Sequence, residues 1–73
     1  MSDRDEIFNR VTKGVPVRRV AKALNTLTSG ISWYGCGKPY MRAAFRGEHA
    51  FASWLGKTTE AELKEAIDKV YTK

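Results

Sequence analysis

The stretch GISWYGCGKPYMRAAF, from Gly30 to Phe45, decides the fold that we predict from the sequence. Its segment Ile31 to Tyr34 is rich in residues that favour strands, and glycines bound it on both sides. Beyond Gly37, strand alternation places Tyr40, Arg42, Ala44 and Arg46 on one face, and Met41, Ala43 and Phe45 on the other. We therefore expect a sheet with one aromatic and basic face.

The predicted sheet has three short antiparallel strands, at Ile31–Tyr34, Pro39–Phe45 and Ala50–Leu55. The segment Arg46-Gly47-Glu48-His49 joins the second strand to the third as a hairpin connection. Gly56 then closes the sheet.

Helices are predicted on both sides of the sheet in the sequence. The first runs from Asp3 to Lys13. The second begins at Pro16 and ends within Asn25 to Gly30; its apolar stripe comprises Val17, Val20, Ala21, Leu24 and Leu27. The last begins with a capping box of Thr59 and Glu62; its apolar stripe comprises Leu63, Ala66, Ile67, Val70 and Tyr71. The predicted fold class is α+β: two N-terminal helices, a three-stranded antiparallel sheet and a C-terminal amphipathic helix packed on the sheet.

The chain of 73 residues has the length of one domain, residues 1–73, with a helical part (1–29) and a sheet-plus-helix part (30–73). Its single cysteine, Cys36, cannot form an internal disulfide, so we expect a cytoplasmic protein. Cys36 and His49 are too few ligands for a structural zinc site, and we expect no cofactor. The acidic start of the chain is unlike a signal peptide, and no apolar run is long enough to span a bilayer.

Positive charge is concentrated in the middle of the chain, whose formal net charge is +5. Between Lys13 and Lys57 the only acidic residue is Glu48. The basic residues of this block are Lys13, Arg18, Arg19, Lys22, Lys38, Arg42, Arg46 and Lys57. An anionic partner is expected to dock here, although a solvated basic surface has the same composition.

The ordered motifs of residues 30–73 resemble a known family. They are Gly-Ile-Ser-Trp-Tyr (30–34), Gly-Lys-Pro-Tyr-Met-Arg-Ala-Ala-Phe (37–45), Trp-Leu-Gly (54–56) and the helix that starts at Thr59. This order is similar to that of the ethylene-response-factor class of DNA-binding domain, whose relatives occur in phage homing endonucleases and integrase arm-binding domains.

The resemblance implies a sheet that lies in the DNA major groove. It places Ser32, Tyr34, Arg42, Arg46 and Trp54 on the nucleic-acid face, and Ile31, Phe45 and Leu55 on the face toward the helix. The family has more arginine on its first and third strands than Ser32, Ala50 and Ala52 supply. Binding to the DNA backbone, or to a protein, therefore stays open.

Individual residues allow more than one role. Tyr40 and Trp54 are candidates for stacking on nucleic acid, for a protein interface, or for burial under the N-terminal helices. Trp33 is expected in the core. A second group of cations, Arg18, Arg19 and Lys22, forms a basic patch on a helix that suits phosphate, an acidic protein or solvent.

Two other classes of protein have less support. A helix-turn-helix that begins at Val20 would have to continue its second helix through Gly35, Gly37 and Pro39, which should break it. For catalysis, Cys36 and His49 are the only candidates for a nucleophile and its base, so we expect no enzyme.

Two hypotheses for function follow. In the first, the chain is a small, phage-encoded transcription regulator that docks on nucleic acid, with DNA as the expected ligand, through Tyr34, Tyr40, Arg42, Arg46 and Trp54, with Lys38 and Lys57 on phosphate. In the second, the chain binds host bacterial RNA polymerase, as small phage proteins of similar size and charge do, and blocks initiation or promotes antitermination. Its basic surfaces, including Arg18, Arg19 and Lys22, would then meet acidic polymerase surface. Self-association through the aromatic residues is a third alternative.

Overall fold

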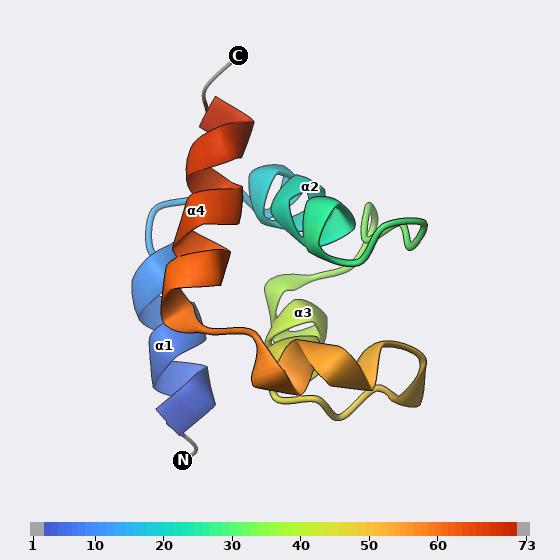
Figure 1. Ribbon diagram of the computed structural model, residues 1–73. Helices are drawn as coiled ribbons and strands as arrows, with labels where there is room; N and C mark the ends of the chain where they lie inside the picture. The colour runs from blue at the N-terminus through green and yellow to red at the C-terminus, as the bar shows by residue number, and fades with distance from the viewer. Residues whose placement is uncertain (1–2, 72–73) are drawn as a thin grey trace.

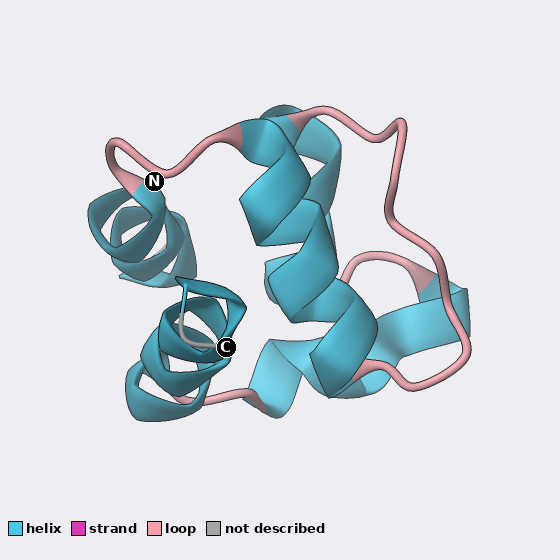
Figure 2. Ribbon diagram, turned by 90° about the horizontal axis from the view of Figure 1, so that it is seen from above, coloured by secondary structure: helices cyan, strands magenta, loops and turns pink. Residues whose placement is uncertain are grey.

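The computed structural model describes residues 3–71, and all regular structure within them is helical (Figure 1). The elements in order are α1 (Asp3–Thr12), α2 (Val17–Leu27), α3 (Lys38–Phe45), the 3₁₀ helix η1 (Ala50–Lys57) and α4 (Glu60–Tyr71). Helix α4 packs against α2 and α1, and α3 packs against α1, α2 and η1. Seen from above, the connecting loops run around the outside of the helices (Figure 2).

The prediction of an α+β fold is wrong, because residues 3–71 contain no strand. The predicted second strand, Pro39–Phe45, lies in α3. Its buried residues are Met41, Ala44 and Phe45, which have the i, i+3, i+4 spacing of a helix and not the alternation of a strand. Pro39 lies in the first turn of α3, where its missing N–H has no intrahelical partner to lose.

The predicted third strand and its hairpin are also wrong, because Ala50–Leu55 lies in η1 and residues 46–49 connect α3 to it. The backbone of Ala52, with φ −146° and ψ 38°, kinks η1. Gly47 and Gly56 explain how this short helix folds back on α3. A Cβ on Gly56 would lie 3.0 Å from the Gly47 Cα, so the two backbones touch where only glycine fits.

The predicted first strand, Ile31–Tyr34, is part of the loop of residues 28–37 between α2 and α3. Trp33 is 1% exposed, which confirms its predicted place in the core. Its backbone N–H donates to Asn25 Oδ1 (2.8 Å), and its indole N–H donates to Thr28 Oγ1 (2.9 Å). The Thr28 hydroxyl donates in turn to the Leu24 carbonyl (2.8 Å). Side-chain hydrogen bonds to the end of α2 therefore replace the strand pairing that the sequence suggested.

The predicted helices are confirmed close to their expected bounds. Helix α1 stops before Gly14, whose φ of 78° suits glycine. The capping box is present: the Thr59 N–H donates to Glu62 Oε1 (2.9 Å), and the Glu62 N–H donates to Thr59 Oγ1 (3.1 Å). The buried stripe of α4 comprises Leu63, Ala66, Ile67 and Val70, whereas Tyr71 is exposed. Because residues 3–71 form no sheet, this stripe packs on α2 and α1.

Arg4 joins α1 to the far end of the fold. Its Nε donates to the Phe45 carbonyl (2.7 Å), and its Nη2 donates to the carbonyls of Leu55 (2.8 Å) and Thr58 (2.7 Å). The guanidinium carbon lies 3.9 Å from the centre of the Phe45 ring. Partial burial lowers the pKa of Arg4 from its ordinary value. One side chain thus satisfies the terminal carbonyls of α3 and η1.

Replacing Thr28 with valine should destabilise the fold, because the buried indole N–H of Trp33 would lose its acceptor. We expect T28V to lower the free energy of unfolding by about 1–3 kcal/mol in a urea titration. The matched control is T26V, since the exposed Thr26 hydroxyl likewise donates to a carbonyl one turn back on α2. Equal losses for the two variants would contradict the anchoring role of Thr28.

Arg4→Lys keeps the positive charge but cannot reproduce the fork that reaches the three carbonyls. We expect it to lower the free energy of unfolding by about 1–3 kcal/mol, by the same urea measurement. Arg10→Lys is the control, because Arg10 makes only an exposed ion pair with Glu60 and should change stability by about 0.5 kcal/mol or less. A stability of Arg4→Lys equal to that of the wild type would contradict the structural role of the fork.

Candidate functional site

Four of the predicted site residues line one pocket of about 430 Å³ between α2, the 28–37 loop and the end of α4. We call it the α2 pocket. It is lined by Pro16, Arg18, Arg19, Lys22, Tyr34 and Val70. The sequence predicts Tyr34 on a sheet and the three cations on a separate helix, whereas the structure brings all four to one pocket.

The packing of α2 and of the loop brings these side chains together. Arg18 and Lys22 are one helical turn apart, so they lie on one face of α2. The opposite face of α2 is buried. In the loop, the buried Trp33 is followed by Tyr34, which is 51% exposed. The anchoring of Trp33 therefore holds the Tyr34 ring at the wall of the basic pocket.

Arg19 is oriented by the last turn of α4. Its guanidinium carbon lies 4.3 Å from the centre of the Tyr71 ring, and its Nη1 lies 3.5 Å from the Val70 carbonyl. A cation suits this position, because the C-terminal end of a helix carries partial negative charge and an aromatic face attracts a guanidinium group. Arg19 is thus partly preorganised, with other N–H donors left for a ligand.

The start of α2 adds positive potential to the pocket. Pro16 occupies the N-cap position without a side-chain hydrogen bond, and the first turn holds no acidic residue. By contrast, the first turns of α1 and α4 both contain carboxylates. Two arginines, Arg18 and Arg19, therefore stand at the positive end of a helix dipole. Among residues 3–71, no ion pair neutralises Arg18, Arg19 or Lys22.

Unlike the cations of α2, Arg42 and Arg46 at the end of α3 form ion pairs with carboxylates. Arg46 Nη1 lies 2.6 Å from Asp5 Oδ1, and its Nε lies 2.7 Å from Glu48 Oε2. Arg42 Nε lies 3.8 Å from the same Asp5 oxygen. The hydrogen bonds to Glu48 and Asp5 raise the pKa of Arg46, and Arg46 lowers the pKa of Glu48. Arg42 and Arg46, predicted to contact DNA from a sheet face, thus make ion pairs within the fold.

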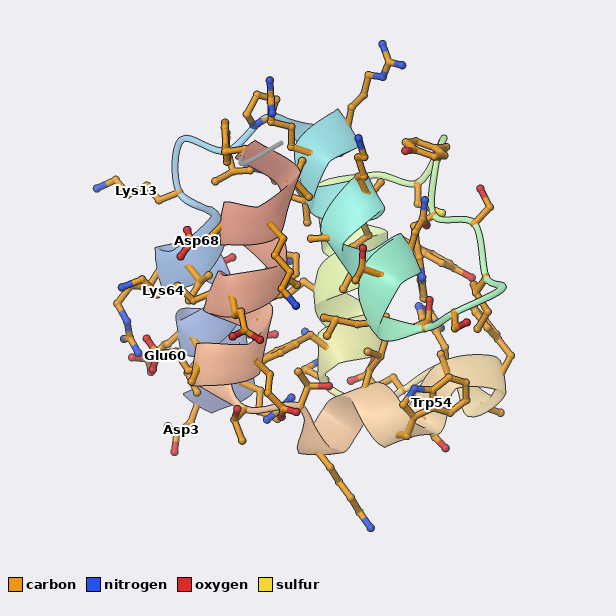
Figure 3. All side chains as sticks on the ribbon, turned by 45° about the horizontal axis from the view of Figure 1, so that its top comes forward. Asp3, Lys13, Trp54, Glu60, Lys64 and Asp68 are labelled. Atoms are coloured by element: carbon orange, nitrogen blue, oxygen red, sulfur yellow. The ribbon has the colours of Figure 1, made fainter. Side chains whose placement is uncertain are left out.

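The remaining predicted residues lie away from the α2 pocket. Lys38 Nζ donates to the Thr12 carbonyl at the end of α1 (3.1 Å), and Lys57 ends η1. Tyr40 and Trp54 are 43% and 51% exposed, so the N-terminal helices do not bury them. Figure 3 shows Trp54 on η1, at the opposite side of the view from Lys13 and the labelled residues of α4.

An exposed aromatic cluster was missed by the sequence analysis. The His49 ring stacks on Tyr40, with ring centres 4.2 Å apart, and on Phe51, with centres 5.4 Å apart. The His49 Nε2 lies 3.2 Å from the Tyr40 carbonyl. Phe51 is 50% exposed, although we assigned it to a strand. The spacing of Tyr40, His49 and Phe51 has no periodicity that would have predicted this cluster, since a turn separates α3 from η1.

Cys36 and His49, the candidates for catalysis, have separate surroundings. Cys36 is half-buried, and its N–H donates to the Trp33 carbonyl (3.1 Å), whereas His49 contacts Tyr40 and Phe51. Across residues 3–71, no three acidic, histidine or cysteine side chains are grouped to hold a metal ion. In the same part of the chain, no helix has the length and apolar character needed to cross a membrane.

Comparison of the chain with family models, with curated proteins and with solved structures finds no match. Within residues 3–71, the three cations that line the α2 pocket have no carboxylate partner, and the adjoining start of α2 has no side-chain cap. Such an arrangement suits an anionic group.

Proposed function

We propose that this chain is a small, non-enzymatic regulatory protein that binds an acidic protein surface through the α2 pocket, and that its partner is a bacterial RNA polymerase. One observation supports the proposal most: Arg18, Arg19 and Lys22 line the same pocket, and within the described residues none of them has a carboxylate partner. Complementary charge speeds the encounter of two proteins and fixes their orientation.

The composition of the pocket supports a protein partner. Its lining combines three cations with Pro16, Val70 and the ring of Tyr34. Tyrosine and arginine are among the residues that contribute most to protein interfaces. Next to the pocket, the ring of the exposed Tyr71 contacts the Arg19 guanidinium.

Nucleic acid has less support as the main ligand. The predicted docking face required a sheet, which is absent from residues 3–71, and both of its arginines, Arg42 and Arg46, pair with carboxylates. Tight binding to a phosphate backbone usually involves many neutralised phosphates, and the α2 pocket offers three cations.

RNA polymerase is proposed as the partner because of the size and charge of the chain. A basic protein of 73 residues with formal net charge +5 is similar in size and charge to phage-encoded regulators of that enzyme. The proposal accordingly places the chain in the cytoplasm of a bacterial host. A protein that binds the polymerase and catalyses no reaction fits either of two effects, inhibition of initiation or antitermination.

Removal of two pocket cations should weaken polymerase binding. We expect the double variant R18Q/K22Q to raise the Kd for purified bacterial RNA polymerase about tenfold or more, measured by biolayer interferometry at physiological salt, because charge-assisted hydrogen bonds are lost. The control is K13Q/K57Q, which removes the same charge from two exposed lysines outside the pocket; we expect its Kd to change about twofold or less.

Two results would contradict the proposal. One is the absence of binding between the wild-type chain and the polymerase. The other is equal weakening by the two double variants, which would indicate attraction by net charge alone. If a DNA or RNA duplex binds with the same dependence on Arg18 and Lys22 while the polymerase does not, the pocket serves nucleic acid instead.

A further inference from the structure

The α2 pocket has two chemically different walls. Arg18, Arg19 and Lys22 supply charge, whereas Pro16, the exposed Tyr34 and the small exposed part of Val70 supply apolar surface. A phosphodiester group would pair with the cations but would leave the apolar wall without a partner. A single anion such as free phosphate would do the same. The apolar wall is best covered by an apolar side chain that arrives together with the anionic groups.

We propose that the α2 pocket recognises a protein segment in which one apolar side chain is flanked by carboxylates on both sides. This inference rests on the proposed function, because it specifies the part of the acidic partner that enters the pocket. It adds two requirements to that function: the bound segment of the partner must contain an apolar side chain, and its carboxylates must have a particular spacing.

The spacing follows from α2. Arg18 and Lys22 are an i, i+4 pair, whose Cβ atoms lie about 5–6 Å apart in a helix. Carboxylates one turn apart on a helical partner have the same separation. Alternate residues on an extended partner are about 6.6–6.8 Å apart, which the long basic side chains also reach. On a helical partner, the residue midway between two such carboxylates lies on the other side of the helix. On an extended partner, an apolar residue shares its face with the residues two positions before and after it, so an extended segment presents an apolar side chain and its flanking carboxylates to the pocket together.

Arg19 has a different role from its two neighbours. Its guanidinium is already held against Tyr71 and near the Val70 carbonyl, so it loses little conformational freedom when a carboxylate binds. Arg18 and Lys22 have no such partner among the described contacts. Arg19 therefore acts as a fixed hydrogen-bond donor to one carboxylate, and Arg18 and Lys22 adapt to the others.

The test is an NMR titration of the full chain with short synthetic peptides. The reference peptide has one leucine between two pairs of glutamates, in a glycine-serine frame. One control peptide replaces the leucine with serine, and another replaces the glutamates with glutamines. We expect the reference peptide to shift the amides of Arg18, Arg19, Lys22, Tyr34 and Val70. Each control peptide should bind about tenfold more weakly, since it loses either apolar burial or the charged contacts.

A variant separates the role of Arg19 from simple charge. R19K keeps the charge but loses the planar group that stacks on Tyr71, and we expect it to bind the reference peptide about tenfold more weakly. K57Q, which removes a charge outside the pocket, should leave the affinity unchanged. Equal binding of the leucine and serine peptides would overturn the inference, as would peptide shifts that lie outside the pocket. Tighter binding of a single-stranded oligonucleotide than of the reference peptide at the same amides would also overturn it.

The peptide titration tests the inference, and the polymerase experiment tests the proposed function, so a negative result in one leaves the other standing. If the peptides bind as expected but the polymerase does not, the recognition of acidic segments stands and the proposed partner is wrong. If the polymerase binds through Arg18 and Lys22 but the serine peptide equals the leucine peptide, the proposed function stands and the inference is wrong.

Discussion

The hydrogen bonds of Trp33 are the interaction on which the rest of the structure depends. They bind the loop of residues 28–37 to the end of α2 through Asn25 and Thr28. The indole contributes the largest fully buried side chain of the core. Because Trp33 points inward, the next residue, Tyr34, lies outside against the basic face of α2. One buried side chain therefore both closes the core and forms a wall of the candidate site.

The distribution of ion pairs determines where the protein remains electropositive. Arg42 and Arg46 are paired with Asp5 and Glu48, and Arg10 is paired with Glu60. The pairs made by Asp5 and by Glu60 join segments far apart in sequence. The cations of α2 have no carboxylate within ion-pair distance in residues 3–71. The cations of α2 thus gather on one surface, whereas other exposed cations without an ion pair in residues 3–71, such as Lys13 and Lys57, lie outside it.

The sequence predicted α1, α2 and α4 because their apolar spacing and end signals agree, as in the capping box of Thr59. The strand prediction for residues 30–57 is wrong; it rested on aromatic and β-branched residues, which favour strands, and on glycines as strand boundaries. There, tertiary contacts override that propensity, since the burial of Trp33, Met41 and Phe45 needs a loop and a helix. Likewise, the cations of α2 were recognised as a patch, but their meeting with Tyr34 depends on the path of the loop and has no local signal.

The central claim is that the α2 pocket, and not the α3 surface, is the part of this protein that meets its partner. The most direct measurement is the loss of amide NMR signal, residue by residue, when the isotope-labelled chain is mixed with a small amount of bacterial RNA polymerase. We expect the loss to be greatest at Arg18, Arg19, Lys22 and Tyr34. Loss centred on Arg42 and Arg46, or spread evenly over the chain, would contradict it.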